Sequence, residues 1–272
     1  MTRRHEPVPD LHVVGVGACR LEYVDLPAAV ADQPALVFLH EGLGCIGMWR
    51  GFPDAVAEVT GCRTVVYSRR GYGGSDPFDA PRTPRYQHDE ALEVLPVLRG
   101  ALGLDRVVLI GHSDGASIAL IHAGAGRWPV DGLVVMAPHE FVEGVTLEGI
   151  SAAVRDWEAT DRASRLGRYH RDPEQVFRAW SDTWLSPAFR AWNIENYLPA
   201  IRCPILAVQG EADGFATMAQ LDAIAAKAIA APRVEQLRLP GCGHSPHRDR
   251  QAEVVDAIAQ FVRRLRLGST SR

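Results

Sequence analysis

The sequence has no hydrophobic run long enough to cross a membrane and no surplus of positive charge. No segment approaches the roughly 18 uninterrupted apolar residues of a spanning helix, and no apolar stretch follows the arginines near the start. The net charge is −4, so nucleic acids and anionic membranes exert no electrostatic attraction on the chain. We therefore expect a cytoplasmic protein with neither nucleic acid nor membrane as a partner.

Cysteines are few and are poorly spaced for cross-linking or metal binding. There are five, at Cys19, Cys45, Cys62, Cys203 and Cys242. An odd number with wide spacing and no Cys-x-x-Cys pair argues against a disulfide framework and a zinc knuckle. We expect buried free thiols and no metal.

Short apolar, β-branched runs alternate with helical patterns, uninterrupted by repeats or Gly/Ser linkers. The runs expected as strands are 13–18, 21–26, 35–40, 63–68, 106–111, 132–137, 204–210 and 234–240. Helical patterns fall at 47–60, 87–102, 114–125, 217–230 and 250–265. Such alternation predicts an α/β fold, a parallel sheet with helices on both faces. The first two strands are too close for a crossover helix and should form an antiparallel hairpin. The end of the chain loses periodicity after Leu267 and is expected to fray.

One segment, 140–200, lacks a strand pattern and is rich in aromatic residues. It contains nine of the twenty aromatics: Phe141, Trp157, Tyr169, Phe177, Trp180, Trp184, Phe189, Trp192 and Tyr197. Loops of this length are rarely structureless inside a compact domain. We predict a helical insertion over a core made of 1–139 and 201–272, with most of its aromatics packing it onto that core.

A serine is bracketed by small residues between a strand pattern and a helix pattern. Ser113 lies in Gly-His-Ser-Asp-Gly, with Gly111 two residues before it and Gly115 two residues after it. A nucleophile elbow needs this context, because the strand and helix backbones approach closely on either side of a strained serine. Taken alone, the five-residue motif is also common as an ordinary turn.

An acid and a histidine follow the serine in the order that such a nucleophile requires. Serine needs a general base, and the base needs a third group that fixes its tautomer. Asp213 follows one expected strand and His244 follows the last, in a glycine-rich loop. Glu211 and His247 are the weaker alternatives. The ordinary roles of Asp213 and His244 would be a turn carboxylate and a loop histidine.

Two backbone amides are expected to bind the oxyanion of a tetrahedral intermediate. One is the N–H of Asp114, which lies at a helix N-terminus. The other comes from the turn at 40–44, where Gly42 is favoured and Leu43 is a candidate for substrate contact. A carboxylate at Glu41 would oppose the developing charge, so we expect it to point away, toward Arg69 or Arg70.

With these motifs in order, the chain resembles the α/β-hydrolase superfamily over nearly its whole length. The resemblance rests on "LVFLHEGLG" with Trp49 nine residues after His40, on "VVYSRRGYGGSD", "LIGHSDGAS", "VQGEAD" and "LPGCGHSPH". It implies an eight-stranded, mostly parallel sheet, a helical cap after the sixth strand and a Ser113–His244–Asp213 triad beneath that cap. Glu41 departs from the usual His-Gly turn, and "HSD" departs from the commoner elbow sequences, which leaves the substrate class open.

We interpret the chain as a cofactor-independent serine hydrolase of a small or medium, largely apolar ester, lactone or thioester. Trp157, Trp180 and Trp184 are the candidates in the cap for contact with this small-molecule substrate. The same triad would serve a carbon–carbon bond hydrolase, and acidic residues in or beside the cap, Glu140, Glu143, Glu148 and Glu195, keep an amidase or aminopeptidase open. A ligand receptor with little turnover is a further alternative. The oligomeric state is also open, with a homodimer among the alternatives.

Overall fold

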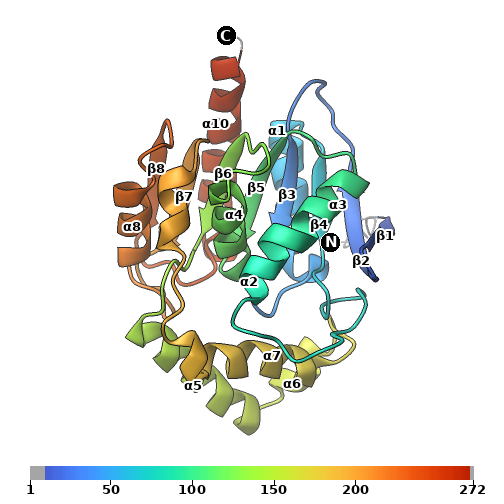
Figure 1. Cartoon of the computed structure of the whole chain (residues 1–272), viewed down its shortest axis with the longest axis vertical. Helices are drawn as coiled ribbons and strands as arrows, with labels where there is room; N and C mark the ends of the chain where they lie inside the picture. Colours follow the sequence, from blue (N-terminus) through green and yellow to red (C-terminus); the bar gives the residue numbers. More distant parts are fainter. Residues whose placement is uncertain (1–9, 270–272) are drawn as a thin grey trace, which may run out of the picture.

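A single twisted sheet organises the chain, and the computed structural model describes residues 10–269 of it (Figure 1). The strands are β1 (Leu11–Val16), β2 (Cys19–Leu26), β3 (Ala35–Leu39), β4 (Thr64–Tyr67), β5 (Val107–His112), β6 (Gly132–Met136), β7 (Ile205–Gly210) and β8 (Val234–Leu239). Their order is β1-β2-β4-β3-β5-β6-β7-β8. The predicted β1–β2 hairpin is confirmed, β2 pairs antiparallel with β4, and all remaining pairs are parallel. The predicted α/β fold, with eight strands, is therefore confirmed.

The strand side chains divide between two cores, one on each face of the sheet. Alternate residues point to opposite faces of a strand, so Leu36 and Phe38 of β3 pack on one side, whereas Val37 and Leu39 pack on the other. Helices α1 (Phe52–Thr60) and α10 (Gln251–Ser269) cover the first face. Helices α3 (Leu95–Ala101), α4 (Asp114–Gly124) and α8 (Ala219–Lys227) cover the second. Burial on both faces explains why the central strands β3 and β6 are apolar throughout.

The helices largely follow the predicted ranges, with differences that have local causes. The pattern at 47–60 forms two pieces, a 3₁₀ turn η1 (Ile46–Trp49) and then α1, because Arg50 between them has a φ of 55°. The pattern at 87–102 begins as α2 (Tyr86–Asp89) and passes through a π-helical turn η2 (Glu90–Val94) into α3. A short α9 (Pro246–Asp249) precedes α10.

The segment 140–200 is helical and lies over the edge of the sheet where β6 has its carboxyl end (Figure 1). It contains α5 (Gly144–Ala159), α6 (Arg162–Leu166), α7 (Pro173–Leu185) and the 3₁₀ turns η3 (Pro187–Phe189) and η4 (Glu195–Ala200). Its two ends are joined, because the Ile194 N–H donates to the Glu140 carbonyl at 2.7 Å and Phe141 pairs with Asn193. We call this segment the cap below.

Three smaller expectations can be compared with the described residues. All five cysteines are free and buried, as predicted. Within residues 10–269, no helix is both long and apolar enough to cross a bilayer. The expected loss of helix after Leu267 is wrong as far as Ser269, where α10 ends. The last three residues and the arginines near the start lie outside the described range.

Replacing Gly115 by alanine should severely destabilise the fold. A Cβ atom there would overlap the main-chain carbonyl of Leu39, and backbone cannot move aside as a side-chain tip can. We expect a loss of at least about 3 kcal/mol, the upper part of the usual range for overpacking, measured by urea unfolding. Gly100→Ala is the control, because no atom lies within 4 Å of its added Cβ. That helical position should gain roughly 0.5 kcal/mol; equal effects at both sites would contradict the backbone clash.

Candidate active site

Ser113 occupies a strained turn between β5 and α4. Its φ of 52° and ψ of −115° lie in a region that non-glycine residues rarely adopt. Such a conformation costs of order 1–3 kcal/mol and persists only where the surroundings enforce it. Here the Ser113 N–H donates to the Met136 carbonyl at 2.9 Å, and its own carbonyl accepts from the Ala116 and Ser117 amides. The hydroxyl therefore stands at the tip of a turn fixed from both sides.

The serine, histidine and aspartate that the sequence singled out lie in one hydrogen-bonded row. His244 Nε2 is 3.0 Å from Ser113 Oγ, and His244 Nδ1 is 2.8 Å from Asp213 Oδ2. The Asp213 carboxylate is fully buried and also accepts the Phe215 N–H at 2.8 Å. Because the carboxylate accepts a hydrogen bond from Nδ1–H, Nε2 is left without a proton and can accept the hydrogen bond of the serine hydroxyl.

The loop that carries His244 is held by its neighbours. His112 Nε2 donates to the His244 carbonyl at 2.6 Å, and Asp249 accepts the Gly243 N–H at 3.1 Å. Burial holds the pKa of His112 well below its usual range, so the ring is neutral with its proton on Nε2. These bonds fix the backbone on which the His244 ring rotates.

Glu211 and His247, the weaker alternatives for the acid and the base, lie apart from the serine. His247 packs among Trp49, Phe52 and His112, with ring centroids 5.0, 5.5 and 4.6 Å away. Burial lowers its pKa to about 3. Glu211 is exposed beyond the end of β7.

The turn after β3 has almost every backbone group engaged. Side chains from two distant segments, the 69–76 loop and the cap, bind its carbonyls: Arg69 binds that of Glu41 at 2.8 Å, Tyr72 that of Gly42 at 2.8 Å, and His170 that of Leu43 at 2.8 Å. The Leu43 and Gly44 amides donate within the turn, to the carboxylate and the carbonyl of Glu41. Among residues 10–269 the Gly42 N–H has no acceptor.

The amide of Asp114 opens α4, and the first amides of a helix have no acceptor within it. The Asp114 side chain is buried in a polar network that the sequence did not predict. Its carboxylate is 1% exposed, accepts from Tyr86 Oη at 2.8 Å and Gln87 Nε2 at 3.1 Å, and lies 3.7 Å from the buried Arg69 guanidinium. It holds α2 and the 69–76 loop against the elbow.

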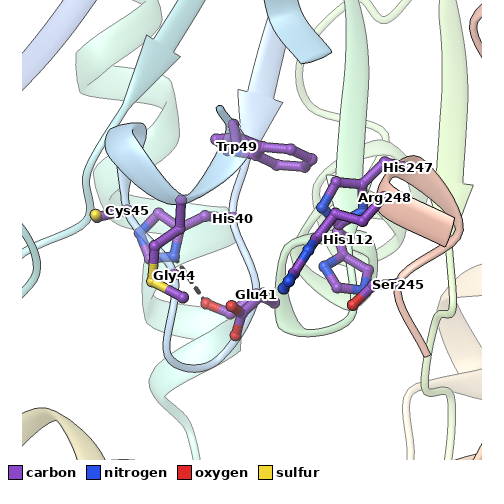
Figure 2. A pocket seen from close by; sticks show the side chains of 10 residues that line it. His40, Glu41, Gly44, Cys45, Trp49, His112, Ser245, His247 and Arg248 are labelled. Carbon is purple, nitrogen blue, oxygen red and sulfur yellow. Dashed lines mark hydrogen bonds between the residues drawn. The ribbon is translucent and has the colours of Figure 1, made fainter. Parts of the chain in front are cut away.

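The ion pair expected for Glu41 is wrong. Arg69 pairs with Asp114, and Arg70 pairs with Asp79. The Glu41 carboxylate instead turns back and accepts the Leu43 N–H at 2.6 Å. Figure 2 shows Glu41 on one side of a cavity of about 20 Å³, with Arg248 and Ser245 facing it from the other. Burial raises the pKa of this carboxyl group.

The aromatic candidates in the cap have different surroundings. Trp180 lies against Gly42, where an added Cβ would be 2.7 Å from its Nε1. Trp157 stacks on Phe177 with centroids 4.0 Å apart and donates to Glu174, inside a cluster that Leu43 also contacts. Trp184 is 1% exposed and donates to Tyr86 Oη at 2.9 Å. Only Trp180 directly covers the turn at Gly42.

Two further rings lie beside His244 that sequence reasoning missed. Phe215 has its centroid 4.8 Å from that of His244 and 6.4 Å from that of Trp180. His139 lies 5.7 Å from His244 and 5.1 Å from Trp184, and burial lowers its pKa to about 4. Both follow strands at the edge that carries the triad, and this placement is the signal that could have identified them.

This sheet order, with a nucleophile elbow after β5 and a histidine after β8, defines an α/β-hydrolase fold. Comparison with family models agrees: residues 36–257 match the model described as "Alpha/beta hydrolase family". The chain therefore belongs to this family.

Individual relatives are distant and differ in activity. The chain is 28% identical over 194 residues to a proline iminopeptidase of Lactobacillus delbrueckii subsp. lactis, which covers 68% of this chain but only 62% of that protein. It is 24% identical over 258 residues to 2-succinyl-6-hydroxy-2,4-cyclohexadiene-1-carboxylate synthase of Salmonella paratyphi C, covering 85% and 94% of the two chains. The enol-lactonase of Burkholderia xenovorans LB400 superposes with a TM-score of 0.71 at 19% identity, over 92% of this chain and 99% of the other.

Removing the Asp114 carboxylate should destabilise the protein strongly. Asp114→Ala leaves the buried Arg69 guanidinium without its ion-pair partner, and breaking a buried pair in this way costs about 3–5 kcal/mol. Urea unfolding measures the loss. Asp161→Ala, which breaks an exposed ion pair with Arg165 in the cap, should leave the midpoint of urea unfolding almost unchanged. Similar shifts for the two variants would contradict this account of the Asp114 side chain.

Proposed function

We propose that the protein is a serine hydrolase that cleaves a small or medium, largely apolar carboxylic ester, lactone or thioester through an acyl-enzyme on Ser113. The observation that carries this proposal is the hydrogen-bonded row from Ser113 Oγ through His244 to the buried Asp213 carboxylate. It is supported by the strained backbone at Ser113 and by the unpaired amide at Gly42. These two features, from the turns after β5 and after β3, suit nucleophilic attack followed by capture of an oxyanion.

In this proposal Ser113 Oγ attacks the carbonyl carbon while His244 Nε2 takes the hydroxyl proton. Asp213 keeps the histidine in the required tautomer and stabilises the imidazolium. The amides of Gly42 and Asp114 donate to the oxyanion, and the imidazolium then gives its proton to the departing alcohol or thiol. Water, deprotonated by the same histidine, attacks the acyl-enzyme and releases the acid.

The preference for an apolar substrate follows from the surroundings of the triad. Trp180 covers Gly42, Phe215 lies beside His244, and the buried His139 ring has a low pKa that keeps it neutral. Such walls exclude water and suit an acyl group without charge. Leu43 and Trp180 are our primary candidates for substrate contact, with Trp157 and Trp184 supporting them from inside the cap and the core.

An aminopeptidase is the second candidate, favoured by the similarity to a proline iminopeptidase. Its substrate amine would need a free carboxylate near Ser113. Glu143 binds Thr217 and Gln220, Glu195 binds Lys227, and Glu148 is exposed. Glu140 is fully buried, and burial raises its pKa well above its usual value. Because these carboxyl groups are engaged, exposed or neutral, the ester hydrolase remains our first proposal.

A p-nitrophenyl ester series from acetate to laurate tests the proposal directly. Wild type should turn over repeatedly with an optimum at short or medium chains, and Ser113→Ala should lose at least about 10⁴-fold in kcat. Proline p-nitroanilide and a vinylogous diketone, assayed beside the esters, test the aminopeptidase and the carbon–carbon hydrolase. Equal rates for wild type and Ser113→Ala would refute the mechanism, and binding without turnover would indicate a receptor.

Asp213→Asn should lower kcat by about 10⁴-fold with little change in KM. The amide keeps the shape of the side chain but favours the wrong histidine tautomer, as established for serine triads. Steady-state kinetics on the preferred ester measures the effect. Glu211→Gln, at the neighbouring exposed carboxylate, is the matched control and should retain wild-type rates. The assignment of the acid would be overturned if Glu211→Gln caused the larger loss.

A further inference from the structure

Glu41 is the one acidic side chain in a turn where the proposed chemistry generates negative charge. The turn at 40–44 has three carbonyls held by Arg69, Tyr72 and His170, as described above. Because each carbonyl shares a planar peptide unit with the next N–H, the Arg69 and Tyr72 bonds also orient the Gly42 and Leu43 N–H groups. Orientation alone does not decide which N–H group stays available for a substrate.

Glu41 accepts two of the N–H groups of the turn. Its main-chain carbonyl accepts the Gly44 N–H at 3.1 Å, and its carboxylate accepts the Leu43 N–H at 2.6 Å. A hydrogen bond from a backbone amide to a carboxylate is charge-assisted and stronger than a bond between neutral groups. Within the described residues no ion pair competes for this carboxylate. The Gly42 N–H, by contrast, has no acceptor among residues 10–269.

We propose that Glu41 is a positioning residue for the oxyanion hole: its carboxyl group holds the Leu43 N–H, which fixes the turn with the Gly42 N–H free for substrate. This inference rests on the serine hydrolase mechanism proposed above. Without an acceptor, the partly buried Leu43 amide must find another partner. Rotation of the Gly42–Leu43 peptide unit provides one, because glycine resists such rotation least. This rotation breaks the Tyr72 bond to the Gly42 carbonyl and shifts the neighbouring Glu41–Gly42 unit. The Gly42 N–H then no longer points at the developing oxyanion.

The role requires an acceptor atom and does not require a negative charge. Glu41→Gln keeps a carbonyl oxygen for the Leu43 N–H and removes the charge that would repel the oxyanion. Glu41→Met has similar length and volume but offers no comparable acceptor. The pair therefore separates hydrogen bonding from charge and from packing.

The kinetics of these two variants on the preferred p-nitrophenyl ester test the proposal. Glu41→Gln should keep kcat within about fivefold of wild type. Glu41→Met should lose about 100-fold in kcat with KM within about threefold, as expected when an oxyanion donor is misplaced. A trifluoromethyl ketone of the same chain length, which forms an oxyanion on the serine, should bind Glu41→Met weaker by a similar factor. The product acid, which forms no oxyanion, should bind both variants equally.

A matched control removes the same kind of bond elsewhere. Asp172 accepts the Gln175 N–H at 2.9 Å at the start of α7, so Asp172→Ala should leave kcat and the affinity for the ketone at wild-type values. If Glu41→Met does not fold, Glu41→Ala is measured in its place. Wild-type kcat in the acceptor-free variant, or equal losses of kcat in Glu41→Gln and Glu41→Met, would overturn the role proposed for Glu41. If Ser113→Ala is inactive in the same assays, the hydrolase mechanism still stands. An active Ser113→Ala would overturn both.

Discussion

The nucleophile elbow depends on main-chain atoms that meet where no side chain fits. A Cβ on Gly111 would overlap the main chain of Gly115, and a Cβ on Gly115 would overlap that of Leu39. This contact sets the direction of α4 and the positive φ of Ser113. It also presses the start of α4 against the end of β3, next to the turn that carries Gly42. The strain at one residue is thus maintained by the tight packing of three elements.

Buried polar groups then hold the loops around that contact. Arg69 links the 69–76 loop to the β3 turn and to Asp114, and Tyr86 links Asp114 to Trp184. Each member of this network has partners, so the low dielectric of the interior strengthens the network. A site that must orient amides for charge development benefits from such rigidity, because the donors need no reorganisation during the reaction.

Much of this architecture could be predicted because it depends on residues that are close together in the sequence. Strand periodicity, the glycines around Ser113 and the order of Asp213 and His244 all report nearby backbone requirements. Two of the missed contacts join distant segments, whereas the third, at Glu41, depends on the rotamer of a side chain within its own turn. The Glu41 carboxylate binds an N–H of its own turn. The Asp114 carboxylate binds a side chain of helix α2, and the Phe215 ring contacts His244 from another loop. Motif spacing carries no information about which rotamer a side chain adopts when the cap packs onto the sheet.

His170 gives the cap a specific mechanical connection to the core. Its ring donates to the Leu43 carbonyl and accepts the Gly73 N–H at 2.9 Å, and the residue lies between α6 and α7. A neutral imidazole has one donor and one acceptor, so both ring nitrogens are used. The ring thereby joins the cap to the turn at 40–44 and to the 69–76 loop. Lifting α6 and α7 away from the sheet must break these bonds. The turn beside the serine is therefore tied to the cap by a hydrogen-bonded ring as well as by the packing of Trp180 on Gly42.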